Sequence, residues 1–120
     1  MNILILEDSE ERIEIFKKAF QTLNVYVATE VDECIQQLKN TKWDFVFLDH
    51  DLGGKVFVDH NKEPTGYHVA EFLKNNPQYK PTKNIIIHSW NGSGIRNMKA
   101  LLPEAIIRSF NPADYTNDQE

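Results

Sequence analysis

Short apolar runs alternate with amphipathic stretches along this chain of 120 residues. Residues 3–6, 45–48 and 85–87 form continuous apolar runs that are too short for helices, which is typical of strands buried on both faces of a sheet. Residues 25–27 and 105–107 are weaker runs rich in β-branched side chains. The pattern therefore predicts five strands.

Between these runs, apolar side chains recur every three or four positions, as they do on one face of a helix. This spacing predicts helices over residues 10–23, 31–40, 66–75 and 95–102. Ser9 stands where an N-cap would lie, and glutamates follow it in the first turn. Strands that alternate with helices in this way predict an α/β fold, a doubly wound five-stranded parallel sheet covered on both faces.

Two segments fall outside the alternation. Residues 52–65 have turn residues at both ends and predict a long loop or small hairpin, placed to act as a lid or substrate wall. Residues 113–120 have no apolar pattern and predict a loose tail after a single domain over residues 1–112. No helix is predicted after the last strand. We therefore expect one sheet face to be partly bare and to be covered by a homodimer partner or by the tail.

Composition narrows the possible partners and the compartment. Thirteen basic residues against eighteen acidic ones give a net charge of −5, which argues against a broad surface for nucleic acid. No apolar run approaches the roughly 18 residues of a membrane span, and the chain opens without the basic segment of a signal peptide, so we expect no membrane association. The single cysteine, Cys34, excludes an internal disulfide. It fits a reducing compartment, so we expect a cytoplasmic protein.

Polar side chains with metal-binding or acid–base chemistry follow three of the predicted strands. They are Glu7 and Asp8 after the first strand, Asp49, His50 and Asp51 after the third, and His88 and Ser89 after the fourth. The carboxyl ends of parallel strands meet at one edge of the sheet, where such folds bind their ligands. Carboxylates gathered there would repel one another unless a cation compensates, so the pattern predicts a divalent ion, Mg²⁺ or Mn²⁺.

The order of these residues resembles a response-regulator receiver domain. The motifs that carry the resemblance are Glu7-Asp8, Asp49, Thr65-Gly66 and Ser89. The resemblance implies a receiver-like (flavodoxin-like) sheet of strand order 2-1-3-4-5. It also implies that Glu7, Asp8 and Asp49 bind the metal, that Asp49 is the phosphoacceptor and that the Ser89 hydroxyl contacts the phosphoryl group.

The chain also departs from the receiver pattern. The lysine that receivers place at the end of the fifth strand is missing, and only Arg108 stands nearby. The usual last helix is missing too, and histidines occur at positions 50, 68 and 88. A narrower family, the cyclic-phosphate processing receiver domains, is more similar. Its resemblance is carried by residues 49–52, by Gly66-Tyr67-His68 and by residues 88–92.

This second resemblance implies a metal-dependent phosphohydrolase or phosphodiesterase. Its substrate would be a phosphate-containing small molecule or an RNA end, either the 2′,3′-cyclic end of damaged RNA, as in RNA repair, or a cyclic nucleotide. The catalytic residues would be Asp49 and His88, with His88 as the leading acid–base and His50, Asp51 and His68 assisting. The phosphate would meet Ser89, Asn91, Gly92 and Ser93, the last three in a glycine-rich turn.

Other interpretations of the same residues stay open. Glu7 or Asp8 could cap the following helix, His88 could be a hydrogen-bonded core histidine, and Asp51 could be a solvated loop acid. The chain could instead be a stand-alone phosphoacceptor receiver in two-component signal transduction. A third possibility is a protein that binds a cyclic nucleotide without cleaving it.

Overall fold

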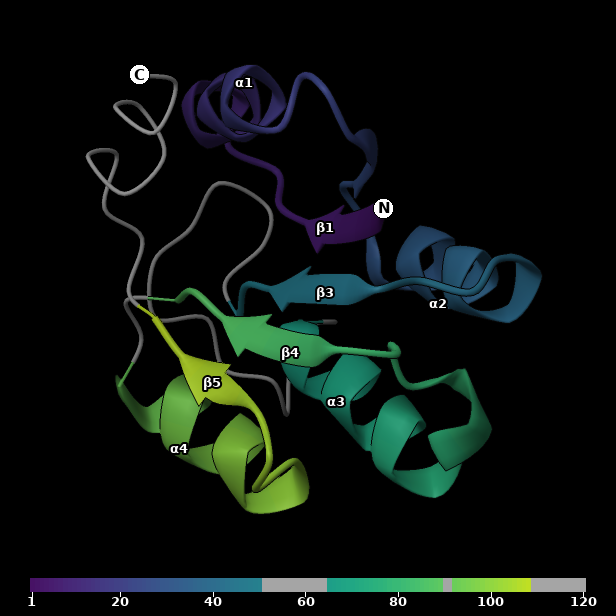
Figure 1. The fold of residues 1–120 in the computed structure, drawn as a ribbon. Helices are drawn as coiled ribbons and strands as arrows, with labels where there is room; N and C mark the ends of the chain where they lie inside the picture. Colours follow the sequence, from purple (N-terminus) through teal and green to yellow (C-terminus); the bar gives the residue numbers. More distant parts are fainter. Residues whose placement is uncertain (51–64, 90–91, 109–120) are drawn as a thin grey trace.

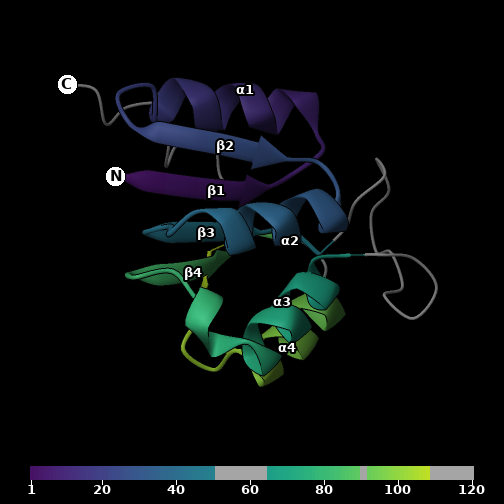
Figure 2. The same cartoon turned by 90° about the vertical axis from the view of Figure 1, so that its right-hand side faces the viewer.

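A computed structural model describes residues 1–50, 65–89 and 92–108 of the chain. Five parallel strands form one sheet in the order β2-β1-β3-β4-β5, which Figures 1 and 2 show together. The strands are β1 (Asn2–Leu6), β2 (Asn24–Ala28), β3 (Phe45–Leu48), β4 (Asn84–Ile87) and β5 (Ile106–Ile107). The predicted sheet and its strand order are confirmed.

Four α-helices and one turn of 3₁₀-helix connect the described parts of the strands. They are α1 (Glu10–Ala19), α2 (Val31–Asn40), α3 (Gly66–Asn75), η1 (Pro77–Tyr79) and α4 (Gly92–Leu101). Figure 2 shows α1 on one side of the sheet, with α2, α3 and α4 on the other. None of the described helices is long and apolar enough to cross a membrane.

Two helices differ from the predicted ranges. α1 ends at Ala19 rather than at residue 23, although Phe20 and Leu23 still pack against the core beyond its end. α4 begins at Gly92, so residues 92–94 form its first turn and not the predicted glycine-rich turn. The reason for a glycine at position 94 is space, because a Cβ there would come within 2.4 Å of the His50 ring.

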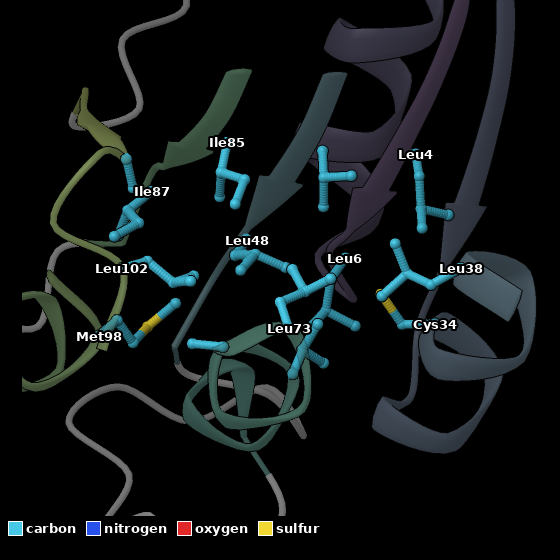
Figure 3. Packing of buried hydrophobic residues seen from close by; sticks show 14 of the residues in the cluster. Leu4, Leu6, Cys34, Leu38, Leu48, Leu73, Ile85, Ile87, Met98 and Leu102 are labelled. Carbon is cyan, nitrogen blue, oxygen red and sulfur yellow. The ribbon is translucent and has the colours of Figure 1, made fainter. Parts of the chain in front are cut away.

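The core is divided by the sheet into two clusters. The larger one packs β1, β3 and β4 against α2, α3 and α4, and Figure 3 shows part of it, including Leu6, Leu48 and Ile87. The smaller one lies against α1. Since successive side chains of a strand point to opposite faces, each strand contributes alternate residues to the two clusters.

The alternation of side chains along the strands also determines which polar residues lie together on the α1 face. The last apolar residues that three neighbouring strands bury there are Ile5, Phe47 and Ile86. Two positions further along, on the same face, come Glu7, Asp49 and His88. The registers pair Leu6 with Leu48 and Leu48 with Ile87, which places these three polar residues side by side in the sheet.

The open edge of the sheet exposes apolar surface. Ile106 and Ile107 of β5 are 46% and 47% exposed. Ile106 pairs with Ile86, so it belongs to the α1 face, where a bare area was predicted. The helix predicted to be missing would fall on residues 109–120, which, like the predicted tail and the loop 52–64, lie outside the described residues. The homodimer stays a prediction.

Gly66 packs the start of α3 against the end of β3. A Cβ at this position would lie 2.1 Å from the backbone oxygen of Asp49, an atom that cannot move without shifting the strand. The Gly66 N–H also donates to the carbonyl of His50 at 3.3 Å. A glycine is therefore required here for close approach.

We predict that Gly66→Ala lowers the free energy of unfolding by about 2 kcal/mol, because the new methyl group forces the helix away from the strand. Gly92→Ala is the matched control. Among the described residues, its Cβ would meet only Arg96 Nη1, at 3.5 Å, and the expected change is within about 0.5 kcal/mol. Urea unfolding of both variants measures the difference, and equal effects would contradict the packing described here.

Candidate functional site

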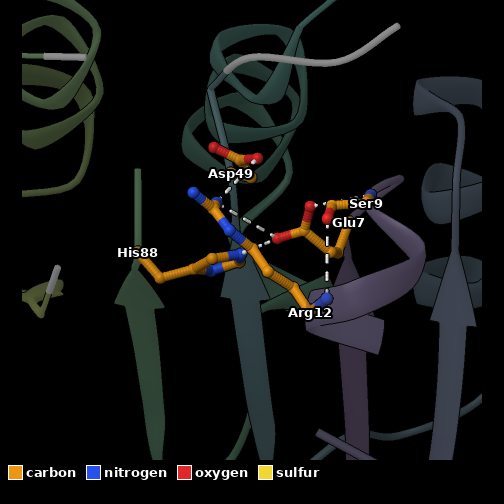
Figure 4. A network of polar contacts seen from close by, with 5 residues as sticks. All are labelled: Glu7, Ser9, Arg12, Asp49 and His88. Atoms are coloured by element: carbon orange, nitrogen blue, oxygen red, sulfur yellow. Dashed lines mark hydrogen bonds and ion pairs between the residues drawn. The ribbon is translucent and has the colours of Figure 1, made fainter. Parts of the chain in front are cut away.

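A cluster of three buried side chains lies at the carboxyl edge of the sheet. Ligand atoms of Glu7, Asp49 and His88 all lie within 4.8 Å of one another. Their residues are 1%, 4% and 0% exposed. Three neighbouring strands thus deliver two carboxyl groups and an imidazole to one point, which is the arrangement shown in Figure 4.

Glu7 has a partner for each carboxyl oxygen. Its Oε2 accepts a hydrogen bond from the backbone N–H of Ser9 at 3.0 Å, and its Oε1 lies 3.0 Å from Nε2 of His88. The backbone N–H of Glu7 still donates to Ala28 as part of the sheet. A carboxyl group at the end of a buried strand is costly to ionise, and these partners offset that cost.

His88 is held between aromatic rings and Glu7. Its ring is 5.4 Å from that of Phe16 in α1 and 6.2 Å from that of Phe47 in β3, measured between centroids. Its Nε2 faces Glu7, whereas its Nδ1 is buried with no hydrogen-bond partner among the described residues. Buried side-chain nitrogens usually have a hydrogen-bond partner. The unpartnered Nδ1 therefore makes His88 a candidate for binding or catalysis.

Burial and charge set the protonation of this pair. Burial lowers the pKa of His88 below its ordinary value, an effect that the neighbouring Glu7 opposes but does not overcome. Burial by itself would raise the pKa of Glu7, but the hydrogen bonds from His88 and Ser9 and the charge of Arg12 lower it. At neutral pH, His88 is therefore a neutral imidazole that donates its Nε2–H to an ionised Glu7.

Arg12 supplies a positive charge beside the two acids. Its Nη1 lies 3.6 Å from Oε1 of Glu7 and 3.7 Å from Oδ2 of Asp49. Figure 4 shows the guanidinium reaching from α1 toward both carboxyl groups. Sequence reasoning missed this residue. A signal was present, because a basic residue in the first turn of a helix opposes the helix dipole and so suggests another partner.

The donor set fits a divalent cation. Carboxylate oxygens suit both Mg²⁺ and Mn²⁺. Glu7 and Asp49 would hold such an ion through their carboxylates, with the imidazole of His88 beside it. Asp8, the other predicted metal ligand, is half-buried and lies outside this cluster.

Two more of the predicted site residues are buried and directly follow cluster residues in the sequence. His50 is 1% exposed, and its ring lies against Gly94 in the first turn of α4. Ser89, predicted to meet the phosphoryl group, is also completely buried. His50 follows Asp49 by one position, and its contact with Gly94 places its ring on the side of the sheet that α4 covers.

The other predicted site residues that the structure describes lie in the first turns of α3 and α4. His68 caps α3, because its Nδ1 accepts a hydrogen bond from the backbone N–H of Thr65 at 3.1 Å. Gly92 and Ser93 are exposed at the start of α4, where Ser93 Oγ accepts a hydrogen bond from Arg96 at 3.3 Å. Asp51 and Asn91 lie outside the described residues.

We predict that acid weakens the fold through the Glu7–His88 pair. Because the pKa of His88 is lowered on folding, the unfolded chain binds a proton near pH 6.5 that the folded chain does not, so stability falls as the pH drops below that value. A second loss follows below about pH 4.5, since the pKa of Glu7 is also lowered. In metal-free buffer, the free energy of unfolding should fall by about 1 kcal/mol from pH 7.5 to pH 5.5.

The matched comparison uses two variants. His88→Gln removes the titrating group and should flatten this pH dependence, whereas Ile85→Val weakens the core without changing a titrating group and should keep it. Chemical unfolding at each pH supplies the measurement. An unchanged slope in His88→Gln would show that His88 is not the source.

The described fold is similar to solved receiver domains of response regulators. A CheY-like receiver domain protein from Methanospirillum hungatei has a TM-score of 0.66 at 18% identity, over 94% of this chain and 85% of that chain. CheY4, a chemotaxis protein of Vibrio cholerae, has a TM-score of 0.68 at 19% identity, over 93% and 89%. TrrA from Thermotoga maritima, solved in complex with Mg²⁺-BeF, has a TM-score of 0.67 at 19% identity, over 92% and 88%. At these identities the likeness shows the fold.

Sequence comparison gives the narrower relationship. Comparison with curated proteins finds no match to this chain. Residues 2–104, however, match the family described as the cyclic-phosphate processing receiver domain. The matched range contains all five residues of the network in Figure 4 and the first four strands of the sheet. The chain therefore belongs to the cyclic-phosphate processing receiver domain family.

Proposed function

We propose that this chain is a metal-dependent phosphodiesterase that hydrolyses cyclic phosphates, such as RNA 2′,3′-cyclic ends or cyclic nucleotides. The observation that carries the proposal is the buried cluster of Glu7, Asp49 and His88. It combines an acid pair that suits a divalent cation with a neutral imidazole that suits proton transfer. The family to which the chain belongs supports the same reaction class.

Glu7 and Asp49 would bind the metal, and Mg²⁺ or Mn²⁺ would polarise the phosphoryl group. The Mg²⁺-BeF complex of TrrA supports a metal and a phosphoryl-like group together in this fold. Ser9 fixes one oxygen of Glu7 through its backbone N–H, and the Glu7 carboxylate therefore keeps its orientation. Preformed ligands reduce the cost of ordering the site when the metal and substrate bind.

His88 would handle the proton. With Nε2–H donated to Glu7, the buried Nδ1 carries the lone pair, and it would accept a proton from the attacking water once substrate binding brings that water to it. The water oxygen forms a bond to phosphorus and one ring P–O bond breaks. The proton returns from His88 to the released ribose oxygen, leaving a phosphomonoester and a hydroxyl group. Glu7 stabilises the imidazolium while it exists, as carboxylates do in other acid–histidine pairs.

A phosphoacceptor receiver is the second candidate. The fold and the position of Asp49 at the end of β3 favour it, as do the receiver domains of similar structure. The imidazole of His88 lies in the same cluster, however, and as a base it would promote hydrolysis of an aspartyl phosphate. Receiver domains place a lysine at the end of the fifth strand, whereas this chain has Arg108 directly after β5. The backbone N–H of Arg108 donates to the carbonyl of Ile87.

We predict that the purified protein opens 2′,3′-cyclic-phosphate RNA or a cyclic dinucleotide in the presence of Mg²⁺ or Mn²⁺. Asp49→Asn should lower the rate at least about 100-fold through loss of a metal ligand. His88→Gln should lower it about 100-fold through loss of the base. Product formation by chromatography measures both effects.

Asp32→Asn makes the same carboxyl-to-amide change on the exposed surface of α2 and should keep full activity. Full activity in Asp49→Asn, or no product from any substrate, would contradict the proposal. A stable, acid-labile phosphoryl group on Asp49 after treatment with a small phosphodonor would favour the receiver. Recovery of an intact cyclic nucleotide in stoichiometric amount would favour a binding protein.

A further inference from the structure

Arg12 is the most exposed member of the charged cluster. Its side chain is 17% exposed, against 1% for Glu7 and 5% for Asp49. The guanidinium lies at similar distances from one oxygen of each acid, 3.6 Å and 3.7 Å. Arg12 thus bridges the two acids and is the side chain of these three that is most open to solvent.

Arg12 lies in the first turn of α1, where the helix dipole makes a positive side chain unfavourable unless acidic groups lie nearby. Its backbone N–H donates to the Ser9 hydroxyl at the N-cap, 3.5 Å away. Residues 10 and 11 of the same turn are acidic, as the positive end of a helix prefers. A positive side chain there is repelled by the helix dipole, and the ion pairs with Glu7 and Asp49 offset that repulsion.

Arg12 and a divalent cation compete for the same two oxygens. A metal ion bound to a carboxylate lies about 2.1 Å from the oxygen. An ion shared by Glu7 Oε1 and Asp49 Oδ2 would fall within a few ångströms of the guanidinium, and like charges that close repel strongly in a buried site. The side chain is long enough to leave while α1 stays in place.

We propose that Arg12 is the resident counter-cation of Glu7 and Asp49, that it exchanges with a divalent cation, and that its freed guanidinium then binds the phosphate. The second half rests on the proposed function, whereas the exchange with metal does not. A guanidinium presents paired N–H donors that match two phosphate oxygens. The divalent cation therefore binds before the phosphate. The guanidinium that then contacts the phosphate comes from α1.

Metal affinity tests the exchange directly. Mn²⁺ titration of the wild-type protein and of Arg12→Met, followed by electron paramagnetic resonance of the free ion, should show about tenfold tighter binding in the variant, because the competing charge is gone. Lys17→Met is the matched control, since it removes one positive charge from the exposed last turn of the same helix. It should leave Mn²⁺ affinity within about twofold.

Phosphate affinity tests the second half. With saturating Mg²⁺, inorganic phosphate should bind Arg12→Met about tenfold more weakly than wild type, measured by calorimetry. Arg12→Lys retains the charge but not the paired donors, so it should restore the wild-type Mn²⁺ affinity and only part of the phosphate affinity. Circular dichroism of each variant verifies the fold before titration.

Equal or weaker Mn²⁺ binding by Arg12→Met than by Lys17→Met would overturn the exchange. Unchanged phosphate binding by Arg12→Met would overturn the anion role and leave the exchange standing. Neither titration involves turnover, so both outcomes are separate from the presence or absence of cyclic-phosphate hydrolysis.

Discussion

Burying the carboxylate of Glu7 at the end of β1 is the constraint on which the site depends. A charge that is 1% exposed needs partners, and it finds a backbone N–H from Ser9, an imidazole N–H from His88 and a guanidinium from Arg12. Two of these partners come from the start of α1, at its N-cap and in its first turn, and the third comes from the end of β4. The carboxylate therefore ties the first helix to the middle of the sheet.

Strand register brings Asp49 into the same environment. Among the described residues of the cluster, two acids and the Arg12 guanidinium leave a net negative charge once His88 is neutral, which is the condition that a divalent cation relieves. The imidazole is kept neutral by its burial between Phe16 and Phe47, so it remains able to accept a proton near neutral pH. The apolar packing of the α1 face thus determines the protonation state of His88 at the edge of the sheet.

The apolar pattern was sufficient for the five-stranded parallel sheet, and the family resemblance supplied its strand order. Position at the strand ends made Glu7, Asp49 and His88 candidates for the site. The sequence alone could not separate these residues from neighbours such as His50 and Ser89, because strands buried on both faces are apolar at every position and hide which side chains share a face. The start of α4 was missed because Gly94 is there for the His50 ring, a contact between distant segments. Arg12 was missed for a similar reason, since its reach to Asp49 depends on how α1 packs on the sheet.

We propose that Glu7 and Asp49 share a divalent cation beside His88. A crystal structure grown with MnCl₂, with anomalous differences collected at the manganese edge, would locate that ion. We expect one strong anomalous peak within bonding distance of both carboxylates, with the Arg12 guanidinium displaced from them. Mn²⁺ bound elsewhere, or the guanidinium still paired with both acids at saturating metal, would contradict the account.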